Sequence, residues 1–290
     1  MNLNLLNHPE KRISRVLIAI TWLLACGTLA PGATSGEPVI GRFNTEKDML
    51  LLHYDCKTDV DDIESAAAAG TILRDQRFKG VRYHAVAGTY GTQGGLYVPA
   101  NDFFARVFGM RWSDAHNAYE AALNDVSRLA IGAMKDGGAV WIAEGGQSDF
   151  SADVLRRVKA ALPDADTGQC FHIVQHSDWN EEVTSAEDLA YVKANAAYHR
   201  IPDGNAPGNG TPCFRTESSA GLDEIQKEEL TAIWKEAVAI SNRFNGTSDR
   251  YLNEAIKSGG LDFSDTVEVC WIFGYSSLAD APEFFREFGR

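Results

Sequence analysis

The sequence predicts an α/β fold with a mostly parallel, doubly wound sheet and helices on both faces. Two observations support this class. Short apolar runs that suit buried strands alternate along the chain with longer segments of helical spacing. No repeat, low-complexity linker or change of composition interrupts this alternation after residue 40. Alternating strands and helices form parallel sheets, because each helix carries the chain back to the edge where the previous strand began.

The first half of the chain begins with a predicted strand at residues 50–54, whose continuous apolar character is typical of burial on both faces. An Ala-rich helix follows over 61–73, and a second strand over 81–87 ends at a glycine. Two helices are predicted next, at 101–108 and 113–135. The longer helix has apolar residues at three- and four-residue steps, a serine able to cap its start and a glycine after its end.

The second half continues the alternation with short apolar runs and amphipathic segments. The predicted strands cover residues 139–143, 171–175 and 267–273, and the predicted helices cover residues 152–162, 186–198 and 225–242. A Gly/Pro/Asn-rich loop occupies residues 205–212. This order fits a single domain over residues 45–290.

The composition excludes some classes of protein. Of the 290 residues, 44% are hydrophobic and 23% are charged, which argues against disorder over most of the chain. The 40 acidic residues outnumber the 27 basic ones, and the formal net charge is -13. A nucleic-acid-binding protein needs a basic face to displace counterions, so this class is not expected. The acid excess is compatible with metals that prefer oxygen ligands.

Residues 1–33 are predicted to be an export signal. A basic segment precedes the apolar run VLIAITWLLA, which has the length of a signal-peptide core and is too short to span a membrane. Cleavage is expected either before Cys26, in a lipobox-like Leu-Leu-Ala-Cys that leaves Cys26 as a lipid anchor, or near Ala30 or Ala33. Both alternatives predict an exported protein, periplasmic, extracellular or lipid-anchored, and the lipobox suggests a bacterium.

Four cysteines follow this segment: Cys56, Cys170, Cys213 and Cys270. An even number in an oxidising compartment allows up to two disulfides, and Cys170 with Cys213 is the preferred pair. Buried free thiols are the alternative. No pair has the Cys-x-x-Cys spacing of a zinc or thioredoxin-like site.

Four carboxylates lie within eight residues after the first predicted strand: Asp55, Asp59, Asp61 and Asp62. One or two of them could cap the helix that follows, but capping does not require four. Clustered carboxylates repel one another unless a cation or shared protons compensate. Because ligands of doubly wound sheets bind beyond the carboxyl ends of the strands, a divalent cation is expected here. Ca²⁺ suits such an oxygen-rich ligand set better than Zn²⁺.

This segment resembles the opening motif of the nucleoside hydrolase family, a strand that runs into Asp-x-Asp-x-x-x-Asp-Asp. Here the pattern is Asp55-x-Lys57-x-Asp59-x-Asp61-Asp62. The first and the last two acids match. Lys57 departs from the family at a position expected to bind Ca²⁺, and Asp59 is the candidate replacement. The chain is therefore similar to a divergent member.

Three further segments extend the resemblance. The turn that ends in Thr89 resembles the family's Val-x-Gly-Asn turn, which contacts substrate. Residues 144–149 resemble Leu-Gly-Pro-Leu-Thr-Asn and put Ser148 where a backbone carbonyl binds the metal. Asp265 takes the place of the last Ca²⁺ ligand, preceded by Ser264 where the family has histidine. These matches occur in the family's order along the chain.

The resemblance implies hydrolysis of the N-glycosidic bond of a nucleoside or related riboside by metal-activated water. Ca²⁺ would be held by Asp59, Asp62, Asp265 and the Ser148 carbonyl. Asp55 would be the general base that accepts the proton of the water.

Other residues are candidates for substrate contact. Asp61 and Thr89 would meet the sugar, and Asn205 and Asn209 lie in the loop that takes the place of the family's Asn-rich binding segment. Lys57 could supply a positive charge beside the metal site.

Three strand-end residues remain open between a functional and a structural role. His176 suits proton transfer to the leaving group, or is only a polar residue at a strand end. Trp179 could stack on the leaving base, or pack as a core or lid aromatic. Glu144 could support the site from behind, or be a solvated turn residue.

Two function classes remain open: a glycosidic hydrolase, and a catalytically weak carbohydrate- or ligand-binding protein on the same scaffold. Both take a small-molecule glycoside as partner. Family members are often oligomeric, so a homo-oligomer is an expectation, although no sequence pattern localises an interface. The geometric prediction is that the carboxylates of Asp55, Asp59, Asp62 and Asp265 converge on one point.

Overall fold

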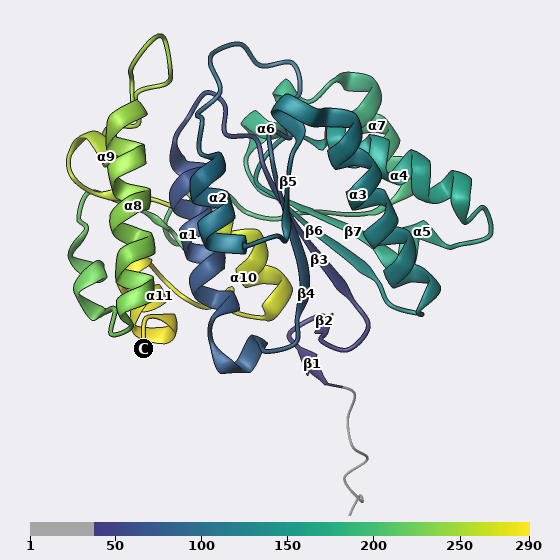
Figure 1. The fold of residues 1–290 in the computed structure, drawn as a ribbon, viewed down its shortest axis with the longest axis horizontal. Coiled ribbons are helices and arrows are strands. Elements are labelled where there is room, and N and C mark those ends of the chain that lie inside the picture. The colour runs from purple at the N-terminus through teal and green to yellow at the C-terminus, as the bar shows by residue number, and fades with distance from the viewer. Residues whose placement is uncertain (1–37) are drawn as a thin grey trace, which may run out of the picture. The chain divides into compact units, whose positions relative to one another are not determined.

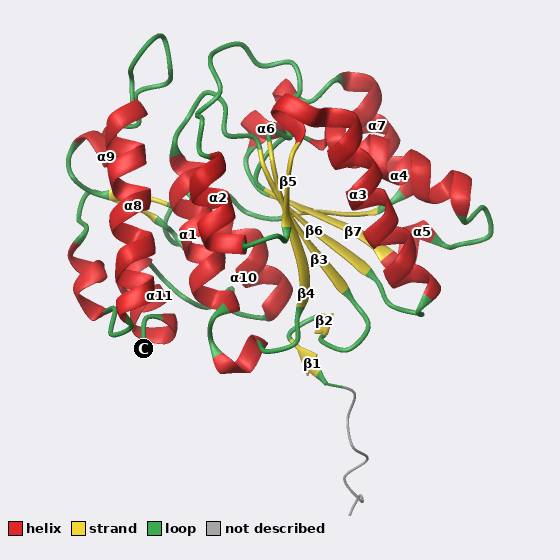
Figure 2. Cartoon of the chain, viewed as in Figure 1, coloured by secondary structure: helices red, strands yellow, loops and turns green. Residues whose placement is uncertain are grey.

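The computed structural model describes residues 38–290, which contain a six-stranded, all-parallel sheet between two layers of helices (Figures 1 and 2). The predicted α/β class with a doubly wound parallel sheet is confirmed. The strands are β3 (Met49–Tyr54), β4 (Arg82–Ala87), β5 (Trp112–Asp114), β6 (Val140–Glu144), β7 (Phe171–Gln175) and β8 (Ala197–Arg200).

The order of strands across this sheet is β5-β4-β3-β6-β7-β8. The chain builds outward from β3 through β4 to β5, returns beside β3 as β6, and then builds in the opposite direction. The order therefore reverses between β3 and β6. A reversal of this kind leaves a crevice at the carboxyl ends of the two strands, where open α/β sheets bind their ligands.

The helices divide into two groups on opposite faces of the sheet, as Figure 1 shows. One face is covered by α3 (Ala115–Lys135), α4 (Ser148–Ala161), α5 (Thr167–Cys170) and α7 (Ala186–Asn195). The other is covered by α1 (Asp61–Leu73), α2 (Asn101–Phe108) and α10 (Val267–Phe273), and α8 (Glu228–Phe244) packs on the outer side of α1 and α2. The remaining helices are α6 (Asp178–Val183), α9 (Glu254–Lys257) and α11 (Ala281–Phe288).

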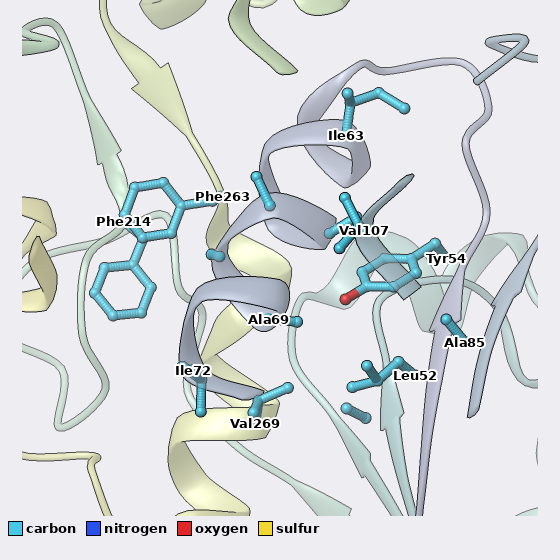
Figure 3. Close-up of a cluster of buried hydrophobic side chains, with 14 of the residues drawn as sticks. Leu52, Tyr54, Ile63, Ala69, Ile72, Ala85, Val107, Phe214, Phe263 and Val269 are labelled. Atoms are coloured by element: carbon cyan, nitrogen blue, oxygen red, sulfur yellow. The ribbon is translucent and has the colours of Figure 1, made fainter. Parts of the chain in front are cut away.

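The alternation of side chains along β3 explains why the sheet has two cores. Leu50, Leu52 and Tyr54 point to the cluster on the α1 side, whereas Met49 and Leu51 belong to the cluster on the α3 side. Figure 3 shows the first cluster, in which residues of β3, α1, α2 and α10 meet. Both faces of β3 are thus buried, as its continuous apolar sequence predicts.

Several predicted elements have the predicted bounds, namely 61–73, 101–108 and 171–175. The predicted strand over 267–273 is wrong, because these residues form the helix α10. A seven-residue apolar run suits a buried helix as well as a buried strand, since the hydrophobic pattern is the same on every side. The helix ends at Gly274, whose φ of 83° is a left-handed conformation that favours glycine.

The two edge strands β5 and β8 are not predicted from the sequence. The helix predicted to reach residue 198 ends at Asn195, and β8 begins two residues later. Both strands are short and half-buried, and they contain polar residues such as Asp114 and Arg200. A short edge strand lacks the continuous apolar run of a central strand.

Small elements complete the described structure. The hairpin β1 (Val39–Ile40) and β2 (Phe43–Asn44) precedes the predicted domain start at residue 45, and a second pair is β9 (Arg215–Thr216) with β10 (Leu261–Asp262). Three 3-10 helices are η1 (Gln76–Phe78), η2 (Ala220–Glu224) and η3 (Ser264–Thr266).

All four cysteines of residues 38–290 are free, so the preferred Cys170–Cys213 disulfide is wrong and the free-thiol alternative holds. Over the same residues, no helix combines the length and the apolar character needed to cross a bilayer. The predicted export signal and the lipid anchor at Cys26 lie outside the described residues.

Candidate functional site

A cavity of about 340 Å³ lies at the carboxyl end of the sheet, beside the ends of β3 and β6 where the strand order reverses. Nine of the predicted site residues line it: Asp55, Lys57, Asp59, Asp61, Asp62, His176, Trp179, Asn205 and Asp265. They come from segments that are far apart in the sequence, including the loop before α1, the start of α6 and the η3 turn.

Two glycines after β6 allow this convergence. A Cβ on Gly145 would lie 2.8 Å from the Cβ of Asp265, and a Cβ on Gly146 would lie 3.0 Å from the Cβ of Asp55. Side chains at these two positions would collide with the carboxylate-bearing residues. The Gly-Gly pair thus lets the β6 turn approach both acids closely.

The acidic segment before α1 does not serve as a helix cap. The N-cap position of α1 is Val60, and no side chain caps the helix there. Asp62 instead accepts the backbone N–H of Cys56 at 2.6 Å, and Asp59 accepts the N–H of Val60 at 2.6 Å. The capping explanation for these carboxylates therefore fails, although the positive end of the α1 dipole still favours negative charge at its first residues.

Three carboxylates form a compact group. Oxygen atoms of Asp61, Asp62 and Asp265 all lie within 4.8 Å of one another. Asp62 is 1% exposed and Asp265 is 6% exposed. Burial, with the charges of neighbouring carboxylates, raises the pKa of both Asp61 and Asp62 well above the usual range. A group of this kind needs protons or a cation to be stable.

One oxygen atom in this group has no partner. Asp62 Oδ2 accepts the Cys56 amide, whereas the buried Oδ1 makes no hydrogen bond. An unsatisfied carboxylate oxygen beside two further carboxylates is a suitable ligand set for a hard divalent cation. The residues present therefore fit such a cation, and nothing in the set is specific to Ca²⁺ rather than another oxygen-preferring metal.

The group contains Asp61 where the resemblance implies Asp59. The carboxylate of Asp59 is 3.4 Å from Nδ2 of Asn253, a residue that also donates to Asp262 at 2.8 Å. Burial and the charge of Asp262 raise the pKa of Asp59 to about 7. Asp59 thus belongs to a second polar network on the wall of the cavity, which also contains Glu64, because Glu64 accepts the backbone N–H of Asp262 at 2.8 Å.

Asp55 lies directly after β3 with both carboxylate oxygens engaged. Its Oδ1 accepts the N–H of Lys57 at 2.7 Å, and its Oδ2 accepts amide N–H groups of Gln147 and Gln93 at 2.8 and 3.1 Å. Burial raises the pKa of Asp55 to about 6, although hydrogen bonds with Lys57, Asp62 and Gln147 favour the charged form. A carboxyl group that titrates near neutral pH in a cavity suits a general base.

His176 lies behind the carboxylate group rather than free in the cavity. Its Nε2 is 3.1 Å from Asp265 Oδ1, and its Nδ1 accepts the backbone N–H of Gly204 at 3.1 Å. Burial disfavours the charged ring, but the charges of Glu268, Asp203 and Asp265 outweigh burial and raise its pKa well above the usual value. Nε2 carries a hydrogen whether the ring is neutral or charged. In the neutral ring, Nδ1 keeps a lone pair and accepts the N–H of Gly204. In the charged ring, the second hydrogen is on Nδ1 and faces the carboxylate of Asp203.

Lys57 makes no ion pair with the cavity acids among residues 38–290. Its backbone N–H holds Asp55, and its ammonium lies 4.2 Å from the centroid of the Tyr90 ring. This cation–π contact stabilises the ammonium group of Lys57 without a carboxylate partner.

The remaining predicted residues do not line the cavity. Ser148 begins α4, with its backbone N–H bonded to Thr184, and Thr89 is fully buried beside the Gly146 turn. Asn209 is exposed and donates to the carbonyl of Asp203. Glu144 is fully buried and contacts Ser151 and His53, so the solvated-turn alternative for this residue is wrong.

Among the residues that contact the cavity or Asp55, the side chains of Gln93, Gln147, Asn180, Arg215 and Tyr251 were not predicted. Gln147 and Asn180 follow the ends of β6 and β7, and this position in the sequence could have indicated that they lie near the cavity. Arg215 and Tyr251 lie in loop-rich segments whose sequence carries no such signal.

No family model matches this chain, and neither a curated protein nor a solved structure matches it.

Proposed function

We propose that this protein is a hydrolase that cleaves the N-glycosidic bond of a nucleoside or related riboside, using water activated at a divalent cation. One observation carries the proposal. Asp265, distant in the sequence, joins the half-buried Asp61 and the buried Asp62 in a group within 4.8 Å, in the crevice between β3 and β6. The nucleoside-hydrolase resemblance of the strand-end motifs adds the reaction class.

The three carboxylates would hold the cation, and His176 would keep Asp265 in place through the Nε2 hydrogen bond. A bound divalent cation, Ca²⁺ by the resemblance, would lower the pKa of water and orient sugar hydroxyls. Asp61 thus takes a ligand role in this proposal, in place of Asp59.

Asp55 would accept the proton of the attacking water. Its carboxylate lines the same cavity as the metal group, and amide donors hold it in a defined orientation. Departure of the aglycone leaves positive charge on the sugar ring. The neighbouring carboxylates, Asp59 among them, stabilise that charge by proximity.

The substrate would contact residues at the cavity wall and mouth. Trp179 lines the cavity with 55% of its surface exposed, which suits stacking against a planar aglycone. Asn205 and Asn180 offer amide groups to sugar hydroxyls. The cavity volume of about 340 Å³ is that of a small-molecule site.

One observation favours the alternative, a ligand-binding protein with weak catalysis. His176 is 2% exposed, and both ring nitrogens contact other protein groups. It is therefore poorly placed to protonate a leaving group. Glycosides whose aglycone departs without a proton would be the substrates that this site turns over best.

Hydrolysis of a nitrophenyl riboside with and without EDTA tests the proposal, because nitrophenolate leaves without protonation. We expect turnover that EDTA abolishes and added Ca²⁺ restores, and loss of about 100-fold or more in Asp55→Asn. Asp136→Asn, an exposed acid paired with Arg82, is the control and should keep full activity. Cation-dependent binding of ribose or a riboside without turnover would instead establish the binding protein.

A further inference from the structure

Two buried glutamine side chains hold the carboxylate of Asp55. Gln147 donates from Nε2 to Asp55 Oδ2 at 2.8 Å, and Gln93 donates from Nε2 to the same oxygen at 3.1 Å. Gln147 is fully buried and Gln93 is 6% exposed. The other oxygen of Asp55 accepts the backbone N–H of Lys57 at 2.7 Å. Three N–H donors therefore define the plane of this carboxylate.

The orientation of the Gln147 amide is determined by its neighbours. Its Oε1 accepts the backbone N–H of Gly91 at 3.1 Å, and a backbone N–H can only donate. The amide nitrogen must then face the opposite way, toward Asp55 and toward Oδ1 of Asn180 at 3.1 Å. The reversed orientation would leave two donors facing each other in a buried site.

The orientation of Gln93 is determined in the same way. Its Nε2 lies 3.2 Å from the carbonyl oxygen of Lys57, which can only accept. The same nitrogen contacts Gln147 Oε1, so its two hydrogens are shared among three acceptors: Asp55, the Lys57 carbonyl and Gln147. Gln93 follows β4 and Gln147 follows β6, and the pair thus joins the loops on both sides of β3 around Asp55.

We infer that Gln147 and Gln93 are positioning residues, which fix the direction in which Asp55 presents its carboxylate to the cavity. This inference rests on the proposed function, because it takes Asp55 as the base. A reacting group that is already oriented loses little freedom in the transition state. Neither glutamine needs to touch the substrate or the cation for this role.

The test uses Gln147→Met and Gln93→Met, which keep the size of the side chain and remove its hydrogen bonds. For nitrophenyl riboside we expect kcat to fall about 10–100-fold in each variant, with KM little changed. Calcium affinity, measured by isothermal titration calorimetry, should stay at the wild-type value, because neither side chain contacts the metal group. Gln93→Met, at the less buried position, serves if Gln147→Met does not fold.

The control is Thr71→Val, which removes another buried hydrogen bond, that from Trp234 at 3.0 Å, within the α1–α8 contact. It should lower the unfolding free energy by an amount similar to the glutamine variants while keeping kcat. Wild-type kcat in both folded glutamine variants would overturn this inference alone, as would parallel losses of kcat and calcium affinity. No turnover by the wild-type protein on any nitrophenyl glycoside would overturn the proposed function and this inference with it.

Discussion

His176 Nε2 lies 3.1 Å from Oδ1 of Asp265, and the backbone N–H of His176 bonds to Glu268, three residues after Asp265. The end of β7 is thereby tied to the η3 turn and the start of α10. These two hydrogen bonds hold Asp265, near the end of the chain, beside Asp61 and Asp62 at the start of α1. A residue expected to act on the leaving group is thus hydrogen-bonded to the carboxylate group of Asp61, Asp62 and Asp265.

Replacing Asp62 by Asn should separate the contribution of a bound cation to stability from the contribution of the protein's own contacts. Without cation, the variant should be at least as stable as the wild type, because one of three adjacent carboxylates, two of them buried, is removed. At a calcium concentration 100 times its Kd, the wild type should gain about 2.7 kcal/mol and the variant much less. Thermal unfolding in EDTA and in calcium measures both. Equal calcium-induced shifts in Tm would contradict the ligand role of Asp62.

His176→Gln should weaken calcium binding about 10–100-fold, because Asp265 loses the partner that orients it. Isothermal titration calorimetry gives this affinity directly. His84→Gln is the matched control, since His84 is also buried but bonds to Ser113 on the far side of the sheet. Calcium binding that is unaffected in a folded His176→Gln protein would show that Asp265 does not depend on this contact.

The buried His84 and the half-buried His172 should contribute stability that is lost as the pH falls from about 6.5 to 4, against the opposite contribution of the cavity carboxylates, whose pKa values are raised. Burial, with the neighbouring His199, lowers the pKa of His172 to about 4, and burial lowers that of His84 to about 4. An unfolded histidine titrates near 6.5, so the unfolded chain binds more protons between these values. The stability contributed by these two neutral histidines is fully present above about pH 6.5 and is lost as the pH falls through 4.

Urea unfolding in EDTA at several pH values measures this dependence. His172→Phe should keep the stacking on Trp141, at a centroid distance of 3.7 Å, without a titrating group. Its free energy of unfolding should therefore rise relative to that of the wild type as the pH falls from about 6.5 to 4. Carboxylates with raised pKa values contribute equally to both proteins and cancel in the difference. Parallel curves would contradict the assignment to His172.

Phe263→Ala should destabilise the protein by about 3–5 kcal/mol. Phe263 is fully buried beside Phe214 (Figure 3), with a ring centroid distance of 4.7 Å, and its ring centroid is 5.4 Å from that of Trp234. Phe263→Leu fills more of the space and should cost less. Urea unfolding measures both. Because Phe263 immediately precedes the η3 turn that carries Asp265, calcium affinity should also fall in the alanine variant.

Local sequence was sufficient where the signal was local. The apolar run of β3 and the acids after it lie next to each other in the chain, so Asp55, Asp61 and Asp62 could be placed at a strand end without the fold. Asp265 was found through the family resemblance, although the element after it is the helix α10 and not a strand.

The role of each acid depended on side-chain directions, which the spacing does not define. Asp59 and Asp61 are two residues apart, yet the carboxylate of Asp61 lies beside those of Asp62 and Asp265, whereas the carboxylate of Asp59 bonds with Asn253. The loop before α1 turns between them, and its φ and ψ angles decide which carboxylate faces Asp265. No pattern of residue types contains that information.

The sequence by itself determined the fold class and the edge of the sheet at which the carboxylates gather, because hydrophobic periodicity and strand-end position are properties of adjacent residues. Only the tertiary structure decided which side chains share the cavity. The glutamine pair around Asp55, the His176–Asp265 bond and the membership of Asp61 each join segments separated by whole strands and helices. Such contacts depend on the order of the strands and the path of the loops, which arise when the two cores pack against the sheet.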